Sequence, residues 1–166
     1  MSGTTIDAVT ELERLEAMSA AELDGYFPGF PAANAARAEE FARRVAGAGG
    51  PKLDYTEESL LPLWEWALGR LGEDALVDGL GAYLSEVALR NVPGARWVLW
   101  RDDVNSVDDN LPLVELYGRE DRAENFLRNA SNTLSLARRG VRGLEPDALL
   151  KVYRRWTKPP PRRLGE

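Results

Sequence analysis

Apolar residues recur at helical spacing through most of the first ninety residues. Near the N-terminus, steps of three separate Ile6, Val9, Leu12 and Leu15. Ser19 and Glu22 then form a Ser-x-x-Glu capping box, which predicts the start of a short helix. Two prolines and a glycine in residues 26–31 predict a break in helical structure, and an Ala- and Arg-rich segment predicts a helix over 34–46.

The next two segments carry the strongest helical patterns. In residues 56–71 a single stripe is formed by Leu60, Trp64, Ala67, Leu68 and Leu71. We expect this helix to begin near Ser59, because Pro62 is then in its first turn, where proline is tolerated. Residues 73–91 form a second helix, whose predicted core side chains are Leu76, Leu80, Tyr83, Leu84 and Val87. Beside them, a stripe of Gly81, Ser85 and Ala88 would allow a neighbouring backbone to approach closely.

The pattern changes after residue 91. Segments 96–101 and 111–117 are rich in aromatic and branched apolar residues and predict two antiparallel strands. Helical spacing resumes from about residue 119 to residue 140, and a last helix is expected with Pro146 in its first turn. The chain is therefore predicted to form a mostly helical α+β domain, with about six helices and one two-stranded antiparallel hairpin. The single domain spans 1–158, and 159–166 form a flexible tail.

Composition removes several classes of chemistry. The chain of 166 residues contains neither cysteine nor histidine. Disulfides, thiolate metal sites, a cysteine nucleophile and the commonest general base are thereby excluded. The N-terminus lacks the basic and apolar stretches of a signal peptide, and no apolar run approaches the roughly 20 residues of a membrane span. We expect a cytoplasmic protein with no cofactor.

Charge is distributed unevenly along the chain. Residues 1–118 carry 9 basic and 21 acidic side chains, whereas residues 119–166 carry 12 basic and 6 acidic ones. The acidic N-terminal part favours contact with a basic protein partner. The basic C-terminal helices are expected to pack against the acidic N-terminal ones. Nucleic-acid binding is a weaker alternative, through Arg138, Arg139, Arg142, Lys151, Arg154, Arg155, Lys158, Arg162 and Arg163, with Tyr153 and Trp156 available for stacking.

An acidic segment between the two predicted strands is the best candidate for a metal site. Its carboxylates are Asp102, Asp103, Asp108 and Asp109. Hard cations bind where several oxygens converge on one point. The spacing does not fit a calcium-binding EF-hand loop, because Asp108 occupies the position that requires glycine. A solvated turn, stabilised by its own Asp and Asn side chains, is the simpler interpretation.

Other polar residues are candidates for contact with a partner. Glu86 lies in the middle of the predicted 73–91 helix. An exposed ion pair with Arg90, one turn later, would account for a glutamate at this position without any functional role. Asn125, Asn129 and Asn132 follow helical spacing, although asparagine disfavours a helix, and they are expected to face either a partner or solvent. Arg96 begins the first predicted strand. We take Glu86, Arg96 and these asparagines as the predicted contacts.

Three short motifs give the chain a resemblance to a known group. They are Leu53-Asp54-Tyr55-Thr56, Gly81-Ala82-Tyr83-Leu84-Ser85-Glu86 and Arg96-Trp97 followed by 110–114. In this order they resemble an uncharacterised family of small bacterial proteins, which have a Gly-x-Tyr-Leu-x-Glu helix followed by a Trp-containing hairpin. The resemblance covers about residues 53–117 and implies an α+β fold. It implies no known activity and no catalytic residue.

Together these patterns favour a non-enzymatic protein-interaction module, of the accessory, adaptor or immunity type, which uses an acidic surface. A homodimer is compatible with the same reasoning. The first alternative is a divalent-cation-dependent hydrolase that uses the 102–109 segment. The second is weak nucleic-acid binding through the C-terminal arginines.

Overall fold

The computed structural model describes residues 9–101 and 106–161. Its N-terminal part consists of α1 (Glu11–Glu16), α2 (Ala20–Tyr26), the 3-10 turn η1 (Phe27–Gly29) and α3 (Phe30–Gly47). Both hydrogen bonds of the predicted Ser19 capping box are present. The predicted break in helical structure is present but shorter than 26–31, because only η1 separates α2 from α3, which already begins at Phe30. Pro31 lies in the first turn of α3, where the missing N–H of proline would have no partner in the helix anyway.

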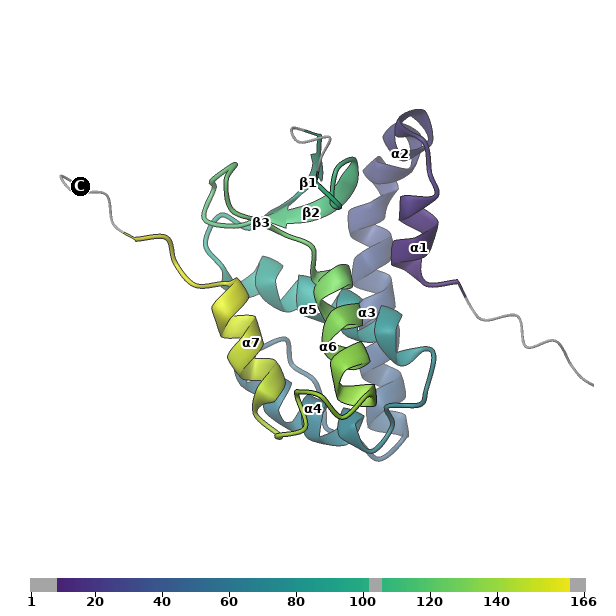
Figure 1. Ribbon diagram of the computed structural model, residues 1–166, viewed down its shortest axis with the longest axis vertical. Helices are drawn as coiled ribbons and strands as arrows, with labels where there is room; N and C mark the ends of the chain where they lie inside the picture. The colour runs from purple at the N-terminus through teal and green to yellow at the C-terminus, as the bar shows by residue number, and fades with distance from the viewer. Residues whose placement is uncertain (1–8, 102–105, 162–166) are drawn as a thin grey trace, which may run out of the picture.

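The next helices agree closely with the pattern of apolar residues. Thr56 caps the 3-10 turn η2 (Glu57–Ser59), and α4 (Leu60–Leu68) follows with Ser59 as its N-cap. Pro62 is thus in the first turn of α4, as predicted. The long helix α5 (Leu76–Asn91) lies at the centre of the molecule, and it packs against both α3 and α6 (Figure 1). All residues from 79 to 88 on α5 are buried.

Two glycines allow this close packing around α5. A Cβ on Gly79 would lie 2.1 Å from Cδ2 of Phe41 on α3. A Cβ on Gly81 would lie 3.1 Å from the Cα of Leu127 on α6 (Phe126–Arg138). The close approach predicted for the small-residue stripe is therefore confirmed at Gly81.

The sheet has one strand more than the predicted hairpin. Strands β1 (Arg96–Trp100) and β2 (Leu111–Glu115) are antiparallel as predicted, with Trp97 opposite Val114. A short third strand, β3 (Ala123–Glu124), pairs with the other edge of β2. Residues 119–125 were predicted to belong to the next helix, but they are not helical, and α6 begins only at Phe126. The chain turns before β3 because Gly118 adopts a positive φ of 63° and the Leu116 N–H donates to the Arg122 carbonyl.

The last helix, α7 (Ala148–Trp156), packs against α4, and the sheet lies above α5 and α6 in Figure 1. Buried side chains form two clusters, and the half-buried Trp97 of β1 contacts both. The prediction of a mostly helical α+β fold is confirmed. Pro146 precedes α7 rather than entering its first turn. Of the predicted tail, residues 162–166 lie outside the described residues, so its flexibility stays a prediction.

Across the described parts of the chain, no helix is both long enough and apolar enough to cross a membrane.

Candidate functional site

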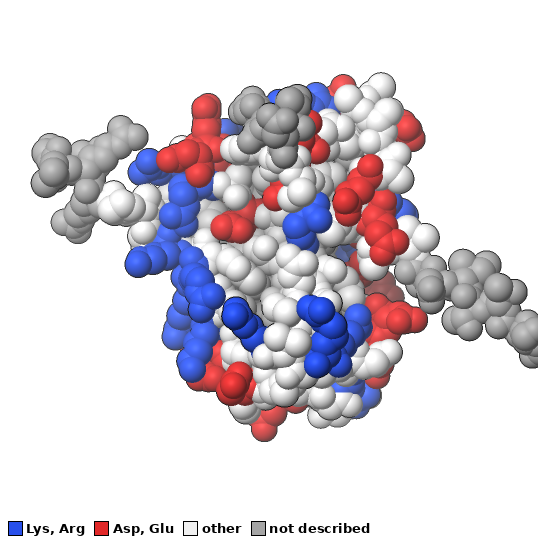
Figure 2. All heavy atoms as spheres, in the orientation of Figure 1, with Lys and Arg blue, Asp and Glu red and all other residues white. Residues whose placement is uncertain are grey.

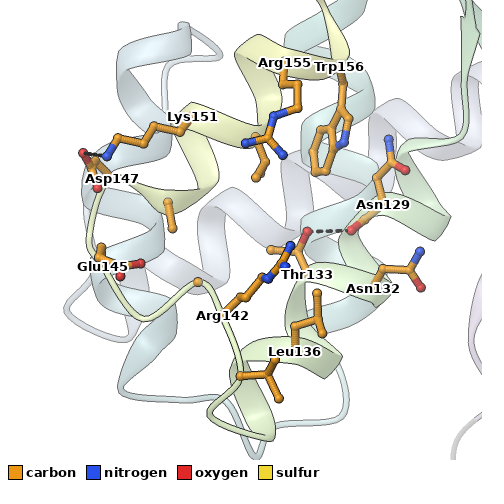
Figure 3. A pocket seen from close by; sticks show the side chains of 14 residues that line it. Asn129, Asn132, Thr133, Leu136, Arg142, Glu145, Asp147, Lys151, Arg155 and Trp156 are labelled. Carbon is orange, nitrogen blue, oxygen red and sulfur yellow. Dashed lines mark hydrogen bonds and ion pairs between the residues drawn. The ribbon is translucent and has the colours of Figure 1, made fainter.

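A groove of about 460 Å³ lies between α6 and α7 (Figure 3). The loop that joins the two helices closes one end of it. Its lining consists of Asn129, Asn132, Thr133, Leu136, Val141, Arg142, Gly143, Glu145, Asp147, Ala148, Lys151, Val152, Arg155 and Trp156. We refer to these residues as the α6–α7 groove.

One wall of the groove is a single stripe along α6. Asn132 and Thr133 lie three and four residues after Asn129, and Leu136 lies one further turn on, so all four share one face of the helix. The opposite side of α6 is buried, with Ala130 and Leu134 fully inaccessible. The Thr133 hydroxyl donates to the Asn129 carbonyl one turn earlier. The amide of Asn132 has no hydrogen bond within the described structure and is exposed.

The end wall is formed by the way in which α6 terminates. The Gly140 N–H donates to the Ala137 carbonyl and the Val141 N–H donates to the Leu136 carbonyl, which together make a Schellman motif. Gly140 has a φ of 67°, the left-handed conformation that this motif requires. In such motifs the apolar residues at the positions of Leu136 and Val141 commonly contact each other, and here both line the groove.

The loop after this motif is tied to the rest of the fold at one point. The Trp64 indole Nε1–H donates to the Gly143 carbonyl over 2.7 Å. Trp64 is itself completely buried on α4. The backbone beside Arg142 is thereby held against the core, while the Arg142 side chain is exposed.

The second wall is an amphipathic face of α7. Ala148, Val152 and Trp156 follow one another at intervals of four and supply apolar surface to the groove. Lys151 and Arg155 form a parallel row beside them. The ring of Trp156 also packs edge-on against Phe126, with centroids 6.2 Å apart, so that one side of the indole is part of the core.

The charges of the lining are only partly neutralised within the molecule. The lining contains three cationic side chains, those of Arg142, Lys151 and Arg155, and two carboxylates, those of Glu145 and Asp147. Lys151 pairs with Asp147 over 3.0 Å. Arg142 and Arg155 have neither a hydrogen bond nor an ion pair with any described residue. Both side chains reach into the groove in Figure 3, and Figure 2 shows basic side chains gathered over α7.

Glu86 is placed in the interior rather than on the surface. Its side chain is on α5, only 7% exposed, and its Oε1 accepts a hydrogen bond of 3.1 Å from the Asn34 amide of α3. The expected exposed pair with Arg90 is wrong, since the Arg90 guanidinium lies 3.6 Å from the ring centroid of Tyr55. The reason is that α3 covers this face of α5, which helical spacing in one segment does not reveal.

Asn125 is also committed to the fold. It is 4% exposed and is the N-cap of α6, where its side-chain oxygen accepts from the Arg128 N–H. Its amide donates to Oδ1 of Asp108, and the Arg128 guanidinium donates to the same oxygen over 2.9 Å. Asp108 therefore anchors the loop before β2 to the start of α6.

The remaining acidic residues of the predicted metal site do not assemble around Asp108. Asp102 and Asp103 lie outside the described residues. Asp109 instead lines a smaller hollow of about 130 Å³ beside Leu15 and Glu16. Within residues 9–101 and 106–161, no group of three or more carboxylates is arranged to hold a metal ion.

The other predicted contacts are divided between the sheet and the groove. Arg96 is exposed on β1 and pairs with Glu115 of β2 over 3.1 Å. Asn129 donates to Oε2 of Glu124 at the end of the groove nearest the sheet. Burial raises the pKa of the Glu124 carboxyl, more than the hydrogen bond from Asn129 and the nearby Arg122 lower it. Asn129 and Asn132 are thus the predicted contacts that belong to the groove.

Several residues of this site were candidates from the sequence, but nothing in the sequence indicated that they lie together. The asparagine pattern pointed to the α6 wall, and Arg142 and Arg155 were considered as ligands for nucleic acid. The apolar part of the site, which is formed by Leu136, Val141 and Val152, was missed, because the sequence assigned none of the three to a site. The chain matches no known family model, and no curated protein or solved structure is significantly similar to it.

Proposed function

We propose that the protein is a non-enzymatic interaction module that binds another protein in the α6–α7 groove. The observation that carries this proposal is the composition of the groove. Apolar side chains line its walls, and the guanidinium groups of Arg142 and Arg155 beside them have no partner among the residues that the structure describes. Elsewhere in the described structure, buried and half-buried charges such as Glu11, Glu86 and Asp108 are bound by neighbouring side chains.

The chemistry of the lining supports recognition more than catalysis. Its one hydroxyl, on Thr133, donates to the backbone of the same helix. Of its two carboxylates, Asp147 is paired with Lys151.

The proposal keeps the interaction-module prediction and moves the contact from the acidic N-terminal surface to a more basic groove. It also places the interaction in the cytoplasm, which fractionation of the native cell would check.

Site-specific crosslinking tests the proposal. A photoreactive amino acid is placed in the native cell at Val141 or Asn132, both exposed in the groove, and at Glu65, which is exposed on α4 outside it. We expect one protein to be captured from the two groove positions and not from Glu65. Capture of the same proteins at all three positions, or of none, would contradict the proposal.

A variant that blocks the groove makes the test specific. Asn132→Trp adds bulk at an exposed position that makes no hydrogen bond in the described structure, so the fold should tolerate it. The captured protein, once purified, should bind the unmodified chain and lose binding to this variant. Undiminished binding would show that the partner contacts another surface.

A further inference from the structure

We infer, on the basis of the proposed function, that the segment bound in the α6–α7 groove is an acidic peptide of the partner that also carries an apolar side chain. Its carboxylates would pair with Arg142 and Arg155. Its apolar side chain would pack against the surface formed by Leu136, Val141 and Val152. This commits the groove to one kind of occupant, opposite in charge to the partner that the overall acidity of the chain suggests.

The guanidinium groups supply the first step of the argument. Arginine can donate two parallel hydrogen bonds to a carboxylate, a geometry that lysine cannot match. Arg142 comes from the loop that closes one end of the groove, and Arg155 comes from the α7 wall (Figure 3). In contrast, Lys151 is paired with Asp147, and the neighbouring Arg154 is paired with Glu57 of η2. Of the three cations that line the groove, Arg142 and Arg155 are therefore the two without a described partner.

The apolar surface between these cations supplies the second step. Val141 is 58% exposed and presents its branched apolar side chain at the groove. Val152 and Trp156 are half-buried and continue this surface along α7. A peptide of carboxylates alone would leave this surface in contact with water. A mixed acidic and apolar segment would cover it and gain the free energy of apolar burial.

The same features disfavour nucleic acid as the occupant. Nucleic-acid binding depends on many phosphate contacts, whereas the groove offers two unpaired cations, with Glu145 and Asp147 in the lining. Base stacking needs a free aromatic face, and Tyr153 is fully buried. Of the two aromatic residues of α7, Trp156 alone lines the groove, so α7 lacks the row of aromatic side chains on which successive bases stack.

Fluorescence anisotropy with labelled peptides tests the inference on the full chain. The probe is a synthetic peptide pool in which Asp or Glu residues flank a Leu, Ile or Phe. A second pool replaces the acidic positions with Lys, and a single-stranded RNA oligonucleotide serves as the third probe. We expect saturable binding of the acidic pool only, which weakens as salt is added.

Charge reversal in the groove is the decisive variant. Arg142→Glu with Arg155→Glu should weaken binding of the acidic pool by about a hundredfold, or about tenfold for each lost charge-assisted hydrogen-bonded pair. The matched control is Arg44→Glu with Lys52→Glu, which makes the same change of charge at two exposed residues outside the groove. The control should bind almost as tightly as the unmodified chain. Equal losses in both double variants would show that only net charge matters and would overturn the inference.

The apolar contribution has its own variant. Val141→Ser removes an exposed apolar side chain and should weaken binding by a few fold while the thermal midpoint changes little. An unchanged affinity would remove the apolar part of the inference.

The outcomes separate this inference from the proposed function. If crosslinking captures a partner in the groove but the Lys pool binds better than the acidic pool, the inference is wrong and the proposed function stands. If the RNA binds most tightly, and does so through Arg142 and Arg155, both are wrong. If the acidic pool binds with the expected dependence on both arginines while crosslinking captures no protein, the chemistry of the groove is supported and its role in the cell is not.

Discussion

The α3–α5 interface and the outer face of α6 show how differently one molecule treats its polar side chains. Where α3 packs against α5, the Asn34 amide donates to the buried carboxylate of Glu86. On its outer face, α6 forms a wall of the α6–α7 groove, where Asn132 has no hydrogen bond to any described residue. The comparison teaches that residue type alone does not distinguish a polar side chain that is hydrogen-bonded within the fold from one that is free to bind another molecule.

Arginines show the same contrast. Arg128, near the start of α6, is bound to Asp108 and to the Val107 carbonyl and is only 22% exposed. Arg155, across the groove on α7, is exposed and has no described partner. If this distinction is correct, substitution of a polar side chain that is bound within the fold should lower the stability strongly. The equivalent substitution of an exposed side chain without a described partner should change it little.

The largest effect is expected at the buried asparagine. Asn34→Ala removes the amide that donates to Glu86, which leaves a carboxylate of 7% exposure without this donor. We expect the free energy of unfolding to fall by about 3 kcal/mol, because a hydrogen bond to a buried charge is lost. Asn132→Ala is the control and should change it by less than about 0.5 kcal/mol. Urea unfolding measures both, and equal losses would remove the contrast.

A slightly smaller loss is expected from Gly79→Ala. The added methyl group would be 2.1 Å from the Phe41 ring, which is itself buried and must move. Overpacking of this kind costs about 2 kcal/mol. Gly25→Ala in α2 is the control, because nothing lies within 4 Å of its Cβ position. There the substitution should stabilise the helix by up to about 1 kcal/mol. Urea midpoints that shift in the same direction would contradict the close approach of α3 and α5.

A moderate effect is expected from Arg128→Ala. It removes the guanidinium that pairs with Asp108, and the free energy of unfolding should fall by about 1 kcal/mol. The unpaired Arg155→Ala should change stability by less than about 0.5 kcal/mol. Thermal melts of the two variants in low salt give the comparison. A larger loss from Arg155→Ala would mean that this side chain has a structural partner after all.

The smallest effect concerns the pH dependence at Glu124. Burial raises the pKa of this carboxyl in the folded state, so its ionisation opposes folding once the pH is above that value. Glu124→Gln keeps an oxygen that can accept from Asn129 and removes the charge. The variant should therefore be slightly more stable than the unmodified chain at neutral pH. The difference should vanish as the pH falls below the usual range of a glutamate, which a pH series of urea midpoints would show.

The sequence predicted those elements whose side chains repeat locally. The start of α4 at Ser59, the buried face of α5 and the pairing of β1 with β2 all follow from spacing and capping within one segment. Strand β3 was not predictable in this way, because two residues carry no detectable period. Its existence depends on β2, which it meets after the turn at Gly118. The start of α3 at Phe30 was missed because prolines were taken as a break, whereas position within the first turn decides their effect.

The sequence by itself thus determined the fold class, most helices, and the exclusion of thiol and imidazole chemistry. It also pointed to the asparagines and arginines of the candidate site, but not to its apolar side chains. Only the tertiary structure decided which of these polar side chains already have a hydrogen-bond or ion-pair partner within the fold. Asn34 and Glu86 are 52 residues apart, and Trp64 reaches Gly143 across 79 residues. A polar group is available for binding only if no other group satisfies it, and in a folded chain the competing groups come from anywhere in the sequence.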